Sequence, residues 1–236
     1  DLDLIQFGET VSLNLNLENV GNDDANGIEV NLTTNDPYIN LTNSSITSFN
    51  LPSDNSYNVE GFEFIVDGNV PNEHDFEIIC NIAANGESWE STLNFTAYAP
   101  SLEIISIIGS LDPGATSDIA INITNLGTAD LHGPGINISG DDYVNIDNVS
   151  FNPYVWPYGL PSDGDVSNLT LTVAVNPSTP IGHIAEFNIT VTSSQPPTTD
   201  YESILTFSIP VGQVIANFES GLGSLEWDLA CSGLGC

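Results

Sequence analysis

Residues 118–124 read Asp-Ile-Ala-Ile-Asn-Ile-Thr, and this stretch decides the fold of the chain. Its three isoleucines alternate with small or polar residues, so successive side chains point to opposite faces of an extended strand. One face then meets a core while the other meets water. The same period of two recurs at residues 11–17, 169–175 and 187–192.

Turn-forming residues separate these alternating stretches. Examples are Gly-Asn-Asp at 21–23, Pro-Ser-Asp-Asn at 52–55 and Asp-Pro-Gly at 112–114. No segment shows the 3.6-residue period of an amphipathic helix. Many short strands bounded by turns are typical of β-sandwiches, so the sequence predicts an all-β fold class.

The chain also carries an internal repeat. Residues 35–41 are echoed by residues 140–146, and late in each unit a Pro-x-x-His or Pro-x-Gly-His stretch ends at an equivalent histidine. We therefore predict two copies of one sandwich, residues 1–99 and 100–212, with limited hinge freedom at the short junction between them. Residues 213–236 lie outside the repeat and read as the start of a further, truncated β module. Three pairs of residues share one constant offset between the two copies: Gly8 and Gly114, Asn19 and Asn125, Gly21 and Gly127.

The composition excludes several classes of partner. The 236 residues include 32 Asp and Glu and no Lys or Arg, for a net charge of -32. Neutralising nucleic-acid phosphates needs cationic side chains, and anionic membrane surfaces attract basic segments. No apolar run reaches the roughly 20 residues of a membrane-spanning helix. We therefore predict neither nucleic-acid binding nor membrane insertion.

The sequence proposes no catalytic group. Of the three imidazoles, His74 and His183 fall at equivalent positions of the two copies, which favours a structural role, and His132 lies in a turn without a Ser or Cys pattern nearby. Nothing selects one pair of carboxylates for glycoside hydrolysis. We predict that this segment is not an enzyme, and a catalytic domain elsewhere in a longer chain stays open.

Acidic loops are the candidate metal sites. Ca²⁺ takes several oxygen ligands from carboxylates and carbonyls, and acidic pairs occur at Asp141 and Asp142 and at Asp23 and Asp24. Since the chain has no cationic side chain of Lys or Arg, a divalent ion would supply the missing opposite charge. The alternative is that these are solvated turn residues. No other cofactor is expected.

An aromatic loop is the candidate ligand site. Residues 153–159 place Tyr154, Trp156 and Tyr158 close together between two expected strands. Aromatic faces stack on sugars, so an exposed loop of this kind would bind glycans. The alternative is a lid that covers one end of the sandwich.

Two covalent modifications are candidates. Cys231 and Cys236 lie among glycines and form a small disulfide or pair with a thiol outside the chain, and Cys80 reads as a buried core thiol. Sequons for N-glycosylation are frequent, although strands that alternate Asn with Thr or Ser generate them without selection. The nine sequons begin at Asn31, Asn40, Asn43, Asn94, Asn122, Asn137, Asn148, Asn168 and Asn188.

The order of motifs resembles a known group of repeats. Each copy runs from a glycine-led turn through an alternating strand to Asn-x-Gly, then to Asp-x-Tyr-Ile/Val and to the histidine described above. This pattern resembles the immunoglobulin-like repeats downstream of the catalytic domain in gingipain-like cysteine peptidases and other secreted bacterial surface proteins. It is also similar to the cell-adhesion-related bacterial domain. The resemblance covers residues 1–212, and residues 213–221 resemble the junction to a following jelly-roll module.

The resemblance implies two tandem immunoglobulin-like sandwiches in an extracellular, secreted or cell-surface protein. Their work would be spacing, cell adhesion or assembly, and no catalytic residue carries over. The alternatives are an accessory region of a secreted gingipain-like peptidase and a carbohydrate-binding module.

Assembly has a physical basis in the residues themselves. Flat Asn, Ser and Thr faces without lysine leave sheet edges open to pairing with another edge, and the net charge of -32 opposes that pairing until a divalent cation screens it. We expect other copies of the chain or neighbouring surface proteins as partners, in a filament or a surface layer, with glycans as further candidates.

Overall fold

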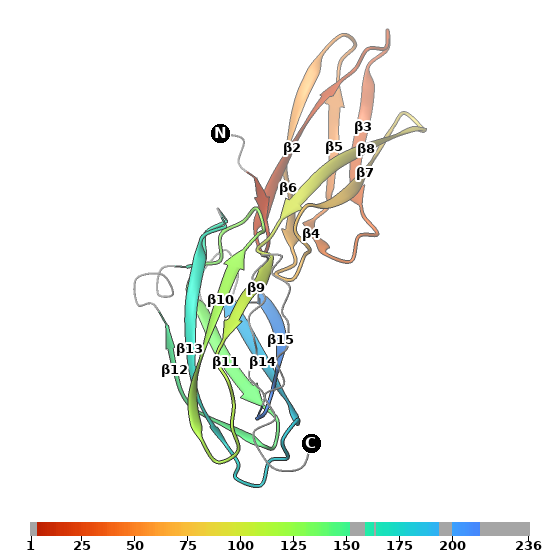
Figure 1. Ribbon diagram of the computed structural model, residues 1–236. Coiled ribbons are helices and arrows are strands. Elements are labelled where there is room, and N and C mark those ends of the chain that lie inside the picture. The colour runs from red at the N-terminus through yellow and green to blue at the C-terminus, as the bar shows by residue number, and fades with distance from the viewer. Residues whose placement is uncertain (1–3, 152–158, 163, 194–199, 213–236) are drawn as a thin grey trace, which may run out of the picture.

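The computed structural model describes residues 4–151, 159–162, 164–193 and 200–212, and every regular element in them is a β-strand. The all-β prediction is confirmed. Figure 1 shows two sandwiches placed end to end, the first coloured red to yellow and the second green to blue. Among the described residues there is no helix of a length and apolarity that would span a membrane.

The first sandwich packs a five-stranded sheet, in the order β1-β8-β7-β3-β5, against a three-stranded sheet, β2-β6-β4. β1 pairs in parallel with the end of β8, and the other pairs are antiparallel. The strands are β1 (Ile5–Gln6), β2 (Thr10–Glu18), β3 (Ala25–Thr33), β4 (Ile39–Asn43), β5 (Ser45–Leu51), β6 (Ser56–Val66), β7 (His74–Ala84) and β8 (Glu87–Tyr98).

The second sandwich has a four-stranded sheet, β12-β13-β10-β9, and a three-stranded sheet, β11-β14-β15. In chain order these are strands D-E-B-A facing C-F-G, which is the seven-strand arrangement of an immunoglobulin constant-type domain. The strands are β9 (Leu102–Ile108), β10 (Thr116–Asn125), β11 (Pro134–Gly140), β12 (Val144–Phe151), β13 (Val166–Val175), β14 (Ile184–Ser193) and β15 (Glu202–Pro210).

The alternating residues form the two cores. Ile119, Ile121 and Ile123 of β10 are completely buried, and so are their antiparallel neighbours in β13. In the first sandwich three rings, those of Phe64, Phe76 and Phe95, lie within contact of one another. Cys80 is buried there, and burial raises the pKa of its thiol.

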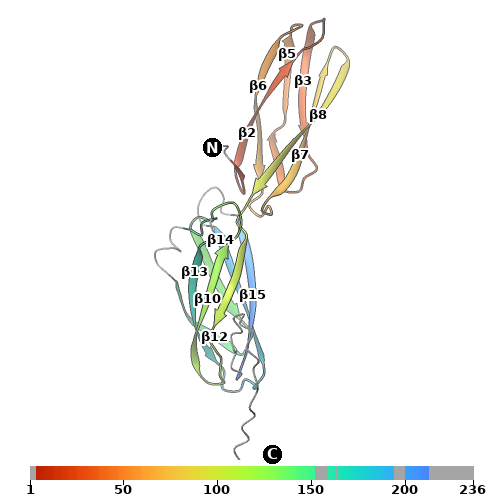
Figure 2. The same cartoon turned by 45° about the horizontal axis from the view of Figure 1, so that its top comes forward.

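One edge distinguishes the two sandwiches. β10 has β13 on one side and β9 on the other. Its counterpart in the first copy, β2, has β6 on one side and, among the described residues, no strand on the other. Figures 1 and 2 show β2 beside its neighbour β6 in the first sandwich.

The matched glycines sit where the chain turns into these two strands. Gly8 and Gly114 have φ values of 67° and 74°, a left-handed conformation that glycine adopts without steric cost.

Candidate functional site

The junction between the sandwiches is the best-built polar site in the described part of the chain. Ala99 and Pro100, the middle of the linker, are buried. Asn72, from the loop before β7, accepts hydrogen bonds at Oδ1 from Ala99 N and from Thr128 N of the second sandwich, both at 3.1 Å. One side chain of the first sandwich thus holds both the linker and the neighbouring module.

A second asparagine bridges the modules directly. Asn69 Nδ2 donates to Asp200 O at 3.1 Å, and Asn69 Oδ1 accepts from Glu202 N at 2.9 Å. Beside it, the Phe7 ring meets the edge of the Tyr201 ring, with centroids 5.5 Å apart. Tyr201 is only 5% exposed, and burial raises the pKa of its phenol. The contact combines an apolar centre with hydrogen bonds at its side.

The second sandwich is hydrogen-bonded to the linker through a buried asparagine. Asn125 Nδ2 donates to Ala129 O and Leu160 O, while its Oδ1 accepts from Gly127 N and from Ser101 N. The Leu126 amide in turn donates to Ser101 O at 2.8 Å. The linker is therefore bonded on both sides, and this arrangement fixes how one module follows the other.

Each sandwich also contains one Asp–His pair at equivalent places. His74 Nε2 lies 2.8 Å from Asp36 Oδ2, and His183 Nε2 lies 2.8 Å from Asp141 Oδ2. The ring of Tyr38 packs on His74, and that of Tyr143 packs on His183. The pairs tie the loop before β4 or β12 to the start of β7 or β14, which accounts for the repeated histidines.

Asp141 has its oxygens engaged within the protein. Burial opposes its ionisation, but hydrogen bonds from Tyr143 N, from the His183 ring and from Glu186 N outweigh burial, and the pKa of Asp141 lies below its ordinary value. Asp142 beside it is exposed.

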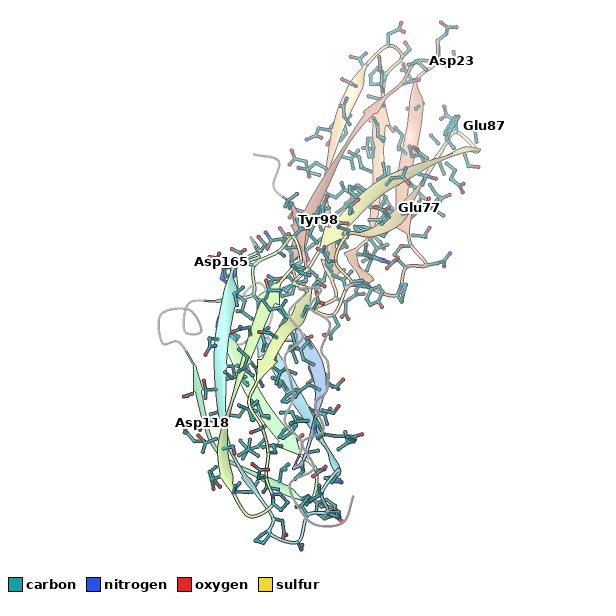
Figure 3. The ribbon with its side chains drawn as sticks, in the orientation of Figure 1. Asp23, Glu77, Glu87, Tyr98, Asp118 and Asp165 are labelled. Carbon is teal, nitrogen blue, oxygen red and sulfur yellow. The ribbon has the colours of Figure 1, made fainter. Side chains whose placement is uncertain are left out.

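The acidic loop at the far end of the first sandwich is arranged differently. Asp24 Oδ1 accepts from Ser53 N at 3.1 Å, and Asp23 lies at the tip (Figure 3). Within the described ranges, no three His, Cys, Asp or Glu side chains gather as a metal site. Binding of Ca²⁺ at these four aspartates remains a prediction.

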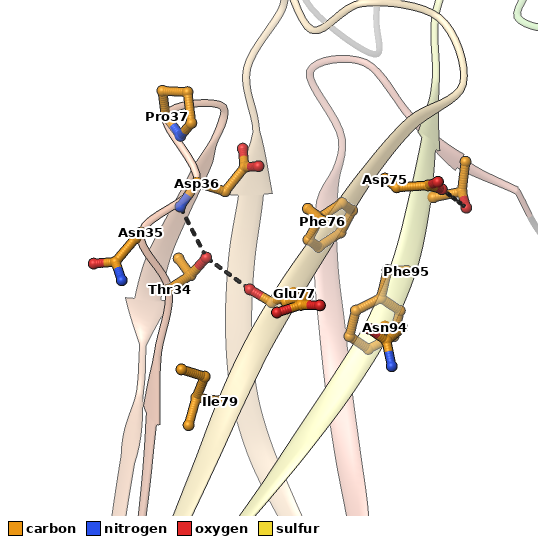
Figure 4. Close-up of a pocket in the computed structure, with 11 residues that line it drawn as sticks. Thr34, Asn35, Asp36, Pro37, Asp75, Phe76, Glu77, Ile79, Asn94 and Phe95 are labelled. Carbon is orange, nitrogen blue, oxygen red and sulfur yellow. Dashed lines mark hydrogen bonds between the residues drawn. The ribbon is translucent and has the colours of Figure 1, made fainter.

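A polar hollow of about 780 Å³ lies on the first sandwich between the loop after β3 and the strands β7 and β8 (Figure 4). Thr34 Oγ1 donates to Glu77 O at 2.8 Å and accepts from Asp36 N, and Thr96 Oγ1 donates to Asp75 Oδ1 at 2.7 Å. Its described lining holds carboxylates, amides and hydroxyls but neither thiol nor imidazole.

The other predicted site residues divide between described and undescribed parts of the chain. Eight of the nine sequon asparagines are exposed; Asn122 is half-buried, and its Nδ2, the atom a glycan would modify, donates to Ser106 Oγ at 2.8 Å. The aromatic loop with Tyr154, Trp156 and Tyr158, the cysteines Cys231 and Cys236, and residues 213–236 as a whole lie outside the described residues. The glycan, disulfide and third-module predictions therefore stay predictions.

Sequence reasoning missed the side chains that build the junction. Asn69 and Asn72 lie in a loop that reads as ordinary turn sequence, and Tyr201 directly precedes the strand β15. The sequence does carry one signal. When the residues after Asp67 are aligned with those after Asn176, the second copy has no asparagine at the positions of Asn69 and Asn72. Only the contact across the junction gives that difference a meaning.

Comparisons with known proteins add little to what the strand order shows about the fold. No known protein family matches the chain, and no curated protein matches it. Among solved structures it is similar to red sea bream transglutaminase (12% identity, TM-score 0.34, 91% of this chain and 30% of that one). It is similar also to Escherichia coli alpha-2-macroglobulin (10%, 0.34, 88% and 16%) and to zebrafish RET cadherin-like domains 1 to 4 (8%, 0.26, 78% and 40%). The chain thus spans less than half the length of each. The fold assignment, two tandem β-sandwiches of immunoglobulin type, rests on the sheets themselves.

Proposed function

We propose that residues 4–212 are a non-catalytic extracellular spacer, a segment that sets the distance and orientation between whatever lies on its two sides. The observation that carries this proposal is the junction. A flexible linker would need no partner for its backbone, whereas here Ala99 is bonded to both modules and Ser101 to the second. A spacer that transmits position needs such a bonded junction, because few-contact interfaces between domains leave them free to move.

The finer assignment, as adhesion or assembly repeats of the kind found in gingipain-like peptidases and other secreted surface proteins, is part of this proposal. Its support is the motif order of the two copies. Gly8 and Gly114 take similar left-handed φ values, and each copy places its Asp, Tyr and His in one cluster. An extracellular location is supported by the exposed sequons, which suit a glycosylated surface.

The test is whether the two sandwiches tumble as one body. ¹⁵N relaxation of the full chain is expected to give a single rotational correlation time, with small-angle scattering fitting one elongated particle. The double variant Asn69→Ala with Asn72→Ala is expected to lower the correlation time of each sandwich and to broaden the scattering distribution, because it removes four hydrogen bonds across or along the junction.

The matched control is Asn58→Ala with Asn145→Ala, two exposed asparagines away from the junction. The control is expected to tumble as the wild type does. Two independent correlation times in the unmodified chain would refute the spacer proposal.

A further inference from the structure

Among the residues that the structure describes, one edge of β2 has no partner strand, whereas the same edge of its counterpart in the second sandwich is paired. There, β9 pairs antiparallel with residues 120–125 of β10. At the constant offset between the copies, the matching backbone is residues 14–18 of β2 together with Asn19, the first residue of the turn after it. This edge is nine residues long and carries neither Pro nor Lys, the residues that commonly protect an open edge.

The side chains of β2 are less buried than their counterparts in β10. Leu13, Leu15 and Leu17 occupy the positions of the completely buried Ile119, Ile121 and Ile123, yet all three are only partly buried. The polar face changes in the same sense, because Asn16 is exposed while its counterpart Asn122 is half-buried and bonded to Ser106 of β9. On both faces, the side chains of β2 are therefore more exposed than those of β10, which the neighbouring strand β9 covers.

The turn after β2 repeats the bonding of the turn after β10, with one bond left open. Asn19 Nδ2 donates to Asp23 O and Leu51 O, and Asn19 Oδ1 accepts from Gly21 N. These three bonds match three of the four that Asn125 makes. The fourth, from the linker amide of Ser101 to Asn125 Oδ1, has no counterpart at Asn19 among the residues the structure describes.

An apolar hollow adjoins this turn. It measures about 450 Å³ and is lined by Leu17, Ile28, Leu51, Ile82 and Trp89, among others. Trp89, in β8, lies opposite Ile82 of β7 in the antiparallel ladder. Its side chain, at the rim of the hollow, is 53% exposed.

In the second sandwich, one continuous segment covers both the edge of β10 and the turn that follows it. Residues 99–101 lie on the Asn125 turn, and residues 102–108 continue as β9 along β10. We propose that the first sandwich accepts one extended aliphatic peptide segment of this kind, which lies over the Asn19–Gly21 turn and pairs antiparallel with β2. The inference deepens the proposed function, on which it rests, by naming the chemistry through which the spacer joins its neighbour.

The occupant is specified by the template that β9 provides. Its aliphatic side chains fall at the spacing of Leu102, Ile104 and Ile107, which pack on the core from the sheet edge. Its backbone would donate to Asn19 Oδ1 and accept from Val20 N, as Ser101 does with Asn125 and Leu126. Main-chain bonds then give affinity and the alternate side chains give selectivity, as in other strand-addition complexes.

A second copy of this chain fits the site less well. In a head-to-tail contact the far end of the second sandwich would have to act as the first sandwich does at the junction, but Ser178 and Ile181 stand there in place of Asn69 and Asn72. In an edge-to-edge contact of two β2 strands, each copy brings a net charge of -32, and that repulsion opposes association.

The experiment uses the full chain and a synthetic peptide with the sequence of residues 99–108. Saturable binding, measured by anisotropy of the labelled peptide, is expected to protect the amide hydrogens of residues 14–19 from exchange. The variant Gly21→Ala is expected to bind at least tenfold more weakly. At the equivalent Gly127 a β-carbon would collide with the Ala99 carbonyl, whereas at Gly21 it meets only Asn19 Oδ1, at 3.1 Å.

Two controls make the outcome specific. The variant Ile181→Ala, an exposed residue at the opposite end of the molecule, is expected to bind the peptide as the wild type does. A peptide in which the residues corresponding to Ile104 and Ile107 are aspartates is expected not to bind.

Two outcomes would overturn the proposal. One is the absence of saturable binding by a folded, monomeric chain. The other is protection of residues 14–19 without peptide in a chain that dimerises, which would make a second copy the occupant. Neither outcome affects the relaxation test of the junction, so failure of this inference and failure of the spacer proposal are separable.

Discussion

β2 and β10 are the same strand in two copies of one fold, with the same alternation and the same turn after them, yet their surroundings differ. β10 lies inside a four-stranded sheet and its three isoleucines are completely buried. In the part of the chain that the structure describes, β2 is the edge strand of a three-stranded sheet, and its three leucines are partly buried. The alternating pattern thus selects a strand and its inward face. How much that face contributes to stability is decided by the neighbouring strand.

The largest expected difference follows from removing one inward side chain in each strand. Ile121→Ala is expected to lower the free energy of unfolding of the second sandwich by about 3–4 kcal/mol, because it leaves a cavity in a closed core. Leu15→Ala is expected to lower that of the first sandwich by about 1–2 kcal/mol, since part of the leucine is already in contact with water. Urea unfolding, with hydrogen exchange to separate the two sandwiches, measures both values.

Equal losses in the two variants would contradict the comparison, because they would mean that β2 is as well covered as β10. The comparison is sharpened by repeating the measurement on Leu15→Ala with the strand peptide present. If the peptide covers β2, the loss caused by Leu15→Ala is expected to rise toward that of Ile121→Ala.

The next difference concerns the two turn asparagines. Asn125→Ala is expected to cost about 3 kcal/mol, since it leaves buried carbonyl and amide groups of the linker and turn without partners. Asn19→Ala removes three bonds that are wholly or partly exposed and is expected to cost about 1 kcal/mol. Thermal unfolding of each variant checks the order, and a larger loss from Asn19→Ala would reverse it.

The repeat itself is visible in the sequence because both copies must solve the same local problems. Alternating Ile and Leu report the strands, and Gly8 and Gly114 report a backbone conformation that other residues avoid. The paired histidines indicate a hydrogen bond, within one copy, to an aspartate thirty-eight or forty-two residues earlier. These features depend on residues within one copy, so each copy records them.

The junction and the open edge are not visible in this way, because they depend on differences between copies. Asn69 and Asn72 resemble any turn asparagine until Asp200 and Thr128 are placed beside them. Tyr201 reads as an ordinary aromatic residue next to a strand, and only its contact with Phe7 across the junction explains why it is buried. The alternation of apolar and polar residues does not indicate whether a strand has a neighbour on one edge or on both.

A smaller difference is expected at the two matched glycines. Gly127→Ala is expected to destabilise the second sandwich by about 1–2 kcal/mol, because the new methyl group displaces the linker backbone at Ala99 and Ser101. Gly21→Ala is expected to change stability by no more than about 0.5 kcal/mol, since the only near atom is a side-chain oxygen. Calorimetry of the two variants measures both effects, and a destabilised Gly21→Ala chain would show that the turn after β2 is already covered.

The smallest effect is the acid response of the second sandwich. Because folding lowers the pKa of Asp141, the folded state binds this proton less tightly than the unfolded chain. The carboxylate therefore stabilises the fold fully above the ordinary aspartate value of about 3.9, and this stabilisation is lost as the pH falls through the lower pKa of the folded state. Asp141→Asn is expected to lower the melting temperature of the second sandwich at pH 6 and to flatten its decline between pH 5 and pH 2, whereas the adjacent exposed Asp142→Asn leaves both unchanged. A decline equally steep in Asp141→Asn would place the acid sensitivity elsewhere, in the mutual repulsion and protonation of the remaining carboxylates.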